Sequence, residues 1–170
     1  TPETVKIEAD QVTADKVEQS VYYPASDEKI PLLIGLLRDI KPVRSMVFVN
    51  TKRVAEKLEG WLNANGFECA VLSGDVPQKK RQSLLKQFKA GELPMLVTTD
   101  VAARGLHIDG VSHVFNYNLP DDAEDYVHRI GRTGRAGTKG ISISLVSEDD
   151  AFELPALEEY LGTKLKLEQP

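Results

Sequence analysis

"SMVFVNTKRVAEKLEGWLNANGFECAVL", residues 45–72, has the pattern of a strand, a helix and a second strand in succession. Residues 45–49 form a continuous apolar run, which is typical of a strand buried on both faces of a sheet. Apolar side chains then recur with helical spacing at Val54, Leu58, Trp61 and Leu62. Residues 69–72 return to an apolar strand pattern. Such a unit joins parallel strands through a right-handed helical crossover.

The same alternation continues on both sides of this unit. Further strands are expected at residues 17–23, 95–99, 111–118 and 140–146, and further helices at 27–40, 77–91, 121–130 and 149–161. This order predicts an α/β fold with a mostly parallel sheet and helices on both faces. Ligands of such sheets meet the loops that follow the carboxyl ends of the strands. The segments "NTKR", "SGD", "TDVAARG" and "GRTGRAG" fall at those loops.

Composition fits one soluble domain of 170 residues, with 41% hydrophobic and 28% charged residues. The sequence shows neither a bilayer-spanning apolar run of about 20 residues nor a signal-peptide pattern, so we expect a cytoplasmic protein with no membrane partner. Cys69 lies in an apolar run and is expected to be a buried structural thiol. His113 lies within an expected strand and is interpreted as structural.

The net charge of −5 is unevenly distributed along the chain. Residues 1–28 and 148–170 each carry −5, so the body between them carries +5. Residues 77–89 hold five positive charges and no negative one, and residues 128–139 hold four more. Each cluster could be a solvated surface, but two clusters without acids favour an anionic partner.

The segment "HRIGRTGRAG", residues 128–137, places cationic side chains among glycines, with no carboxylate in the segment to pair them. Its glycines would end the preceding helix, so its arginines cannot form one helical stripe. Because planar guanidinium groups match phosphate oxygens, we predict that Arg129, Arg132 and Arg135 face phosphate groups of a ligand. The alternative is a surface loop of solvated arginines.

Nothing in the sequence matches the phosphate-binding loop G-x-x-x-x-G-K-[ST] or the dinucleotide fingerprint G-x-G-x-x-G. Arginines suited to phosphate without such a cradle suggest that they act on a nucleotide held elsewhere, as an arginine finger does. No residue is predicted to bind a metal ion.

Four segments together resemble motifs of the DEAD-box RNA helicases, in that family's order and spacing. They are "MVFVNTKR" (46–53), "SGD" followed by "QKKR" (73–81), "TDVAARG" (99–105) and "HRIGRTGR" (128–135). The resemblance implies the second of two RecA-like lobes, a three-layer sandwich over residues 17–165. Residues 1–16 would then be a linker or N-terminal arm, and residues 166–170 the start of a C-terminal tail.

The resemblance implies a role for each matching residue. Arg132 and Arg135 match the arginines that reach across an interlobe cleft to the γ-phosphate of ATP. His128 matches the residue that links this loop to the acidic motif of the other lobe, and Gly105 and His107 match a contact near the ribose. The residues that match the surface gripping the RNA sugar–phosphate backbone are Thr51, Gly74, Asp75, Gln78, Arg81, Thr99 and Arg104.

Two of these assignments carry qualifications, and one further motif position departs from the family. Arg104 is also expected to help couple the RNA and nucleotide sites. His107 stands where most relatives have Asp, so one carboxylate acceptor for the ribose is missing, and His107 either accepts a single hydrogen bond or only packs. Ser73 stands where many relatives have His.

The implied partners are RNA, bound without sequence preference through its backbone, and an N-terminal RecA-like lobe. ATP and Mg²⁺ would be held mainly by that lobe, so residues 1–170 alone are expected to lack ATPase and unwinding activity. Within the family, the sequence looks closest to members of RNA-degrading assemblies, which implies RNase E as a partner. The acidic stretch 147–161 is interpreted as a solvated helix or a partner-binding surface.

Two other functions stay open. One is a non-enzymatic RNA- or protein-binding module with the same fold. The other is a self-contained α/β hydrolase, which would need a carboxylate cluster or a phosphate-binding lysine near the loops. Asp100 is the one acid in its strand-end loop, and the sequence offers neither feature.

Overall fold

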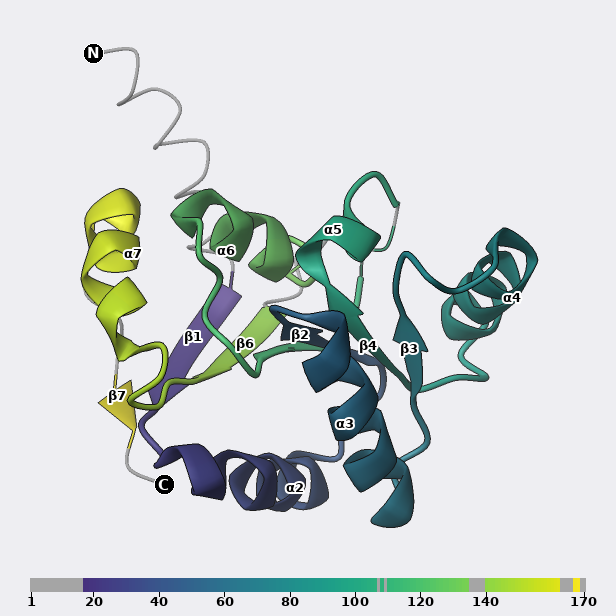
Figure 1. Cartoon of the computed structure of the whole chain (residues 1–170), viewed down its shortest axis with the longest axis horizontal. Helices are drawn as coiled ribbons and strands as arrows, with labels where there is room; N and C mark the ends of the chain where they lie inside the picture. Colours follow the sequence, from purple (N-terminus) through teal and green to yellow (C-terminus); the bar gives the residue numbers. More distant parts are fainter. Residues whose placement is uncertain (1–16, 107, 109, 135–139, 163–166, 169–170) are drawn as a thin grey trace.

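The computed structural model describes residues 17–106, 108, 110–134, 140–162 and 167–168. Their core is one seven-stranded sheet with the strand order β3-β4-β2-β5-β6-β1-β7. Each pair of neighbouring strands is parallel. Helices lie on both faces of this sheet (Figure 1), so the predicted α/β architecture is confirmed.

The strands are β1 (Val17–Tyr22), β2 (Ser45–Val49), β3 (Ala70–Leu72), β4 (Met95–Thr99), β5 (His113–Asn116), β6 (Gly140–Leu145) and β7 (Leu167–Glu168). The α-helices are α2 (Lys29–Ile40), α3 (Lys52–Ala64), α4 (Gln78–Lys89), α5 (Asp100–Ala103), α6 (Ala123–Ile130) and α7 (Leu154–Leu161). Single 3₁₀ turns, Ser26–Glu28 and Ala151–Glu153, precede α2 and α7.

The hydrophobic core has two parts, one on each face of the sheet, where the helices pack against the strands. Helices α2 and α3 pack Leu33, Leu37, Leu58 and Leu62 on one face of the sheet. The other face is covered by α4 to α7, with Phe88 of α4 and Tyr126 of α6 fully buried. Strand β2 is buried at all five positions, as its continuous apolar run predicts.

Two short elements were not expected from the sequence. Helix α5 is a single turn that begins directly after β4, where Thr99 caps it by accepting a hydrogen bond from the Ala102 N–H at 3.3 Å. Strand β7 pairs with β1, so residues predicted to start a C-terminal tail belong to the sheet. Both are too short to leave a periodic pattern. The predicted arm, residues 1–16, lies outside the described residues.

The isolated cysteine and one histidine have the structural roles expected of them. Cys69 is 7% exposed, and burial raises the pKa of its thiol to about 12. His113 is half-buried in β5, where its Nδ1 lies 2.9 Å from the Ser112 hydroxyl and burial lowers its pKa. No helix in the described ranges is long and apolar enough to cross a membrane.

Candidate functional site

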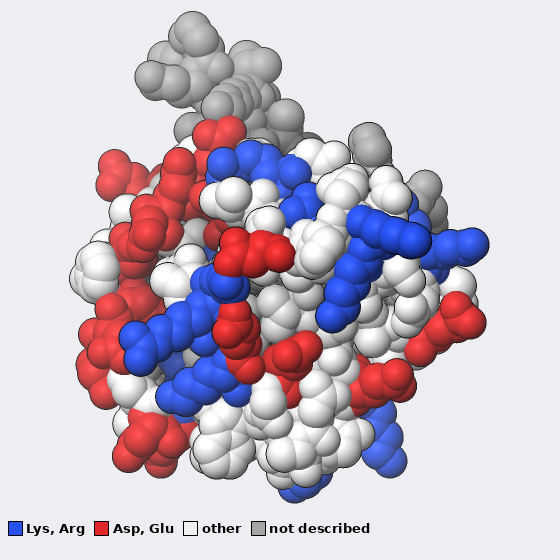
Figure 2. All heavy atoms as spheres, turned by 45° about the vertical axis from the view of Figure 1, so that its right-hand side comes forward, with Lys and Arg blue, Asp and Glu red and all other residues white. Residues whose placement is uncertain are grey.

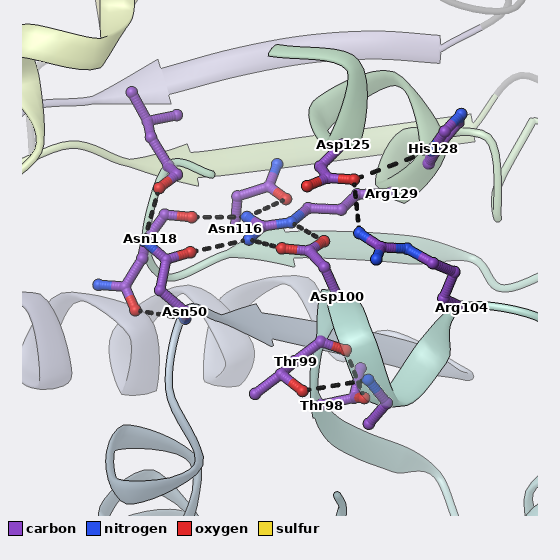
Figure 3. A network of polar contacts seen from close by, with 12 residues as sticks. Asn50, Thr98, Thr99, Asp100, Arg104, Asn116, Asn118, Asp125, His128 and Arg129 are labelled. Atoms are coloured by element: carbon purple, nitrogen blue, oxygen red, sulfur yellow. Dashed lines mark hydrogen bonds and ion pairs between the residues drawn. The ribbon is translucent and has the colours of Figure 1, made fainter. Parts of the chain in front are cut away.

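Three neighbouring strands, β4, β2 and β5, end in polar residues at one edge of the sheet. Asp100 follows β4, Asn50 follows β2, and Asn116 is the last residue of β5. Figure 3 shows these side chains converging on Arg129, which comes from the last turn of α6. Because the strands are parallel and adjacent, side chains far apart in sequence meet at this edge.

Arg129 is the centre of this cluster, and it is 1% exposed. Its Nε and Nη2 donate to the two carboxylate oxygens of Asp100, both at 2.7 Å, which is the bidentate geometry of a strong ion pair. Nη2 also donates to Asn50 Oδ1 at 3.0 Å, and Nη1 donates to the Asn118 carbonyl at 2.6 Å and to Asn116 Oδ1 at 3.5 Å. We call these five residues the Arg129 network.

The prediction that Arg129 faces a ligand phosphate is therefore wrong. Its guanidinium is saturated by the protein itself and lies over the Phe48 ring, 5.2 Å from the ring centroid. The pairing carboxylate, Asp100, lies 29 positions earlier in the chain, so a count of charges in the segment 128–137 could not find it. Solvation, the alternative considered for these arginines, is equally excluded for Arg129.

Beside the network lies a cavity of about 170 Å³ that gathers several of the predicted nucleotide-facing residues. Arg104, Gly105, His128 and Arg132 all line it, together with Asp125 and members of the Arg129 network. The segments 99–105 and 128–134 therefore meet at one place, as expected if they serve one ligand.

Arg132 lies against the turn that follows α5. Its Nη1 donates to the carbonyls of Leu106 at 2.7 Å and Ile108 at 3.3 Å, and its Nη2 donates to the Ala103 carbonyl at 3.1 Å. Gly105, within this turn, has φ +82°, a conformation that favours glycine. The guanidinium is thus held at the cavity wall by backbone acceptors of the same turn.

His128 and Arg104 are the exposed side chains of the cavity rim, at 61% and 63% side-chain exposure. Arg104 Nη2 lies 3.3 Å from Asp125 Oδ1. His128 Nδ1 lies 3.9 Å from the same oxygen, and His128 Nε2 lies 3.7 Å from Glu124 Oε1. Asp125 of α6 therefore pairs with Arg104, and two carboxylates of α6 lie within 4 Å of the His128 ring.

Two predicted residues, Arg135 and His107, lie outside the described residues. Described residues that precede and follow the gap 135–139 nevertheless make close contacts. Thr133 Oγ1 donates to the Val111 carbonyl at 2.5 Å, and a Cβ at Gly140 would collide with Thr133 and with the Gly134 amide. Glycine is therefore required at the start of β6, where the strand passes Thr133 and Gly134.

The predicted RNA-facing residues lie along the same edge, at the ends of β2, β3 and β4. Thr51 and Thr99 accept hydrogen bonds from the N–H groups of Val54 and Ala102, and so cap α3 and α5. Asp75, in the loop after β3, pairs with Lys52, and this hydrogen bond raises the pKa of Lys52. The structure thus brings the predicted set to one edge.

Two further RNA-facing predictions fall on α4. Gln78 is the first residue of the helix and is exposed. Arg81 Nη2 donates to the Ser73 carbonyl at 3.3 Å, which ties the helix to the loop that contains Gly74. The lysines of α4 are exposed as expected of an anion-facing surface.

Acidic and basic side chains are unevenly distributed on the surface. Figure 2 shows acidic side chains most crowded toward the side of the molecule where α7 lies, with basic side chains both among them and at the upper right of the view. Helix α7 buries Leu154, Leu157 and Leu161, so its acids form the outer face of a packed helix. Among the described residues, no group of three His, Cys, Asp or Glu side chains could hold a metal ion.

Sequence reasoning missed Asn50, Asn116 and Asn118, which hold the network together. The available signal was their position at strand ends: Asn50 directly follows the apolar run 45–49, and Asn116 and Asn118 lie at the end of the expected strand 111–118. A polar residue at the end of a buried strand must find partners, and here the partner is Arg129.

The parallel sheet has a cavity at its strand ends, where two loop segments meet, which is the place at which α/β domains bind their ligands. The chain belongs to the family described as the helicase conserved C-terminal domain, whose model matches residues 28–137. It is 54% identical over 168 residues to the ATP-dependent RNA helicase RhlB of Haemophilus influenzae. That match covers 99% of this chain and 40% of the relative, so the chain spans well under half of the curated relatives it matches.

Solved structures of DEAD-box proteins have the same fold, which confirms the RecA-like architecture implied by the sequence. Escherichia coli SrmB, bound to the regulator RraA, superposes with a TM-score of 0.83 at 40% identity, covering 89% of this chain and 90% of that one. Saccharomyces cerevisiae Dbp5, bound to RNA and ADP BeF3, superposes with a TM-score of 0.82 at 36% identity, covering 91% of this chain and 42% of that one.

Proposed function

We propose that this chain is the C-terminal lobe of an ATP-dependent DEAD-box RNA helicase, and that it acts on ATP held mainly by an N-terminal lobe. One observation carries the proposal: the arginine segment and the 99–105 turn share one cavity, in which Arg132 bonds the carbonyls of Ala103 and Leu106. This arrangement positions a guanidinium at the strand edge where a nucleotide binds in α/β sheets.

The cavity is too small to enclose a nucleotide by itself, which supports the proposal that a second lobe completes the binding site. At about 170 Å³ it is smaller than the roughly 300–1,000 Å³ of pockets that enclose a small ligand. Arg132, and Arg135 by resemblance, would stabilise negative charge on the γ-phosphate as hydrolysis proceeds. His128 would contact the other lobe, and Gly105 and His107 would lie near the ribose. Mg²⁺ would neutralise phosphate charge from the N-terminal lobe.

RNA is proposed to bind along the ends of β2, β3 and β4 through its sugar–phosphate backbone. The N-termini of α3 and α4 reach this edge, and helix N-termini attract phosphate groups. Thr51, Gly74, Asp75, Gln78, Arg81, Thr99 and Arg104 are the proposed contacts. The Arg129 network joins Asn50, next to Thr51, with Asp100, next to Thr99, and so supports both sides of this surface.

The finer biological setting is also a proposal. A role in RNA degradation with RNase E as a partner, and a cytoplasmic location, are proposed from the resemblance of the sequence motifs to helicases of RNA-degrading assemblies. The outer, acidic face of α7 is one surface that such a partner could use.

The direct test compares ATP hydrolysis by residues 1–170 with hydrolysis by the complete protein, each with Mg²⁺ and a short RNA duplex. We expect turnover and unwinding from the complete protein, and neither from residues 1–170. Turnover by residues 1–170 alone would identify a self-contained hydrolase. RNA binding by a complete protein without ATPase activity would identify a non-enzymatic module.

A further inference from the structure

An open groove of about 600 Å³ lies between α2 and α3, on the face of the sheet opposite α5 and α6 (Figure 1). It shares no lining residue with the cavity at the strand ends. Its principal walls are formed by Ile30, Pro31, Ile34, Arg38, Lys57 and Trp61. Figure 2 shows a patch of uncharged surface near the lower edge of the molecule, bordered by charged side chains, at the level of α2 and α3 in Figure 1.

The only tryptophan of the chain, Trp61, stands in this groove with 50% of its surface exposed. Its neighbours on α3, Leu58 and Leu62, are fully buried and make the contacts with the core. Tryptophan buries more apolar surface than other side chains when covered, and it is enriched at the centres of protein interfaces. Trp61 therefore contributes less to the core than a tryptophan can, which is typical of a contact residue.

Two glycines lower the helix surfaces around Trp61. Gly35 lies in the middle of α2 and lines the groove, and Gly60 lies in the middle of α3 and lines an adjoining hollow beside Trp61. Nothing lies within 4 Å of the position of a Cβ at either residue. Each glycine costs roughly 1 kcal/mol relative to alanine inside a helix. No packing within the described chain requires either one, whereas close approach of another chain would.

Three charged side chains line this groove, the cations Arg38 and Lys57 and the acid Asp27, so its lining carries one net positive charge. Arg38 donates to Asn65 Oδ1 at 3.4 Å, a weak contact, and Lys57 has no carboxylate within ion-pair distance among the described residues. A ligand that carries a carboxylate next to a large apolar side chain would complement both the cations and the apolar floor of the groove. The few cations and the apolar floor fit a peptide better than RNA, which requires repeated phosphate contacts.

We propose that the groove between α2 and α3 binds a short peptide segment of a partner protein, in which an aromatic or large aliphatic residue is followed or preceded by an acidic residue. The apolar side chain lies over Gly35 against Trp61, Ile30 and Ile34, and the carboxylate meets Arg38 or Lys57. This is the recognition of an amphipathic peptide in a groove between helices. It leaves the edge with the Arg129 network accessible and does not depend on the function proposed for that edge.

The test uses phage-displayed random 12-residue peptides selected on residues 1–170, followed by titration of the selected synthetic peptides. Trp61 fluorescence reports binding directly, because no other tryptophan is present. Gly35→Leu fills the groove with a good helix former, so this variant is expected to be at least as stable as the parent. Ala156→Leu, which adds the same side chain to exposed α7, is the matched control.

We expect selected peptides to combine an apolar anchor with Asp or Glu, and to shift Trp61 emission to shorter wavelength. Gly35→Leu and the charge reversal Arg38→Glu/Lys57→Glu should each weaken binding about tenfold or more, while Ala156→Leu leaves it unchanged. Failure to select peptides, selection of peptides without acids, or binding unaffected by Gly35→Leu would overturn the proposal. So would binding by residues 1–170 but not by the complete protein, because the groove would then be covered by the protein's own chain.

Discussion

Arg129→Met removes the guanidinium that joins the ends of β2, β4 and β5 and leaves the Asp100 carboxylate without its bidentate partner. The Asp100 side chain is 18% exposed, so water can compensate only part of the lost interaction. Breaking a buried pair by removing one partner costs about 3–5 kcal/mol. For a chain of this length, that loss lowers the melting temperature by roughly 10 °C. Chemical denaturation followed by circular dichroism measures the free energy of unfolding directly.

Two controls separate the pair from a general effect of lost charge. Arg104→Gln removes an exposed cation from Asp125 and should cost less than about 1 kcal/mol. Arg129→Met combined with Asp100→Asn should cost less than the sum of the single changes, because no unpaired charge remains. A loss below about 1 kcal/mol for Arg129→Met, or additivity in the double variant, would refute the buried network.

Further predictions at Cys69, at two glycines and at Lys80 test other parts of the molecule. Burial raises the pKa of the Cys69 thiol from 9.0 to about 12, which lowers the thiolate fraction at pH 8 about 10³-fold. Labelling of Cys69 by a disulfide reagent should therefore be at least 10³-fold slower in the native chain than in the denatured chain. Comparable labelling rates in the two states would contradict the burial of Cys69. The same shift makes stability fall as pH rises above about 9, because the unfolded thiol ionises first. Gly35→Ala should stabilise by up to about 1 kcal/mol and Gly140→Ala should destabilise, as measured by urea unfolding; equal effects would contradict the crowding at Gly140. Lys80→Ala should lower the slope of log binding constant against log salt for RNA by about 0.7 in the complete protein, and an unchanged slope would remove α4 from the RNA surface.

The fold was largely predictable because its strands and helices carry strong periodic patterns. The continuous apolar run 45–49 matches β2, and 95–99 matches β4, residue for residue. The expected strand 111–118 shortens to His113–Asn116, since Val111 forms only an isolated bridge with Thr133 and the Asn118 carbonyl accepts a hydrogen bond from Arg129. Helix α5 and strand β7 could not be found, since four and two residues show no period.

The site was predictable where residues match motifs of a known family and unpredictable where it depends on pairing across the sheet. The resemblance to the DEAD-box motifs assigned both Arg132 and Gly105 to a nucleotide site, and they line one cavity. It could not assign Arg129, because that assignment requires knowing that Asp100 and Asn50 lie on adjacent strand ends. A charge count along the segment therefore identified a cationic cluster but not which cation serves the protein's own structure.

The central claim is that this lobe supplies arginines to ATP held by another lobe, and Arg135→Ala in the complete protein tests it most directly. Single-turnover hydrolysis with RNA and Mg²⁺ should fall about 10³-fold or more, while RNA binding without nucleotide stays at the parent level. Arg38→Ala, on the opposite layer at α2, should leave hydrolysis unchanged. Hydrolysis by Arg135→Ala at the parent rate would contradict the account.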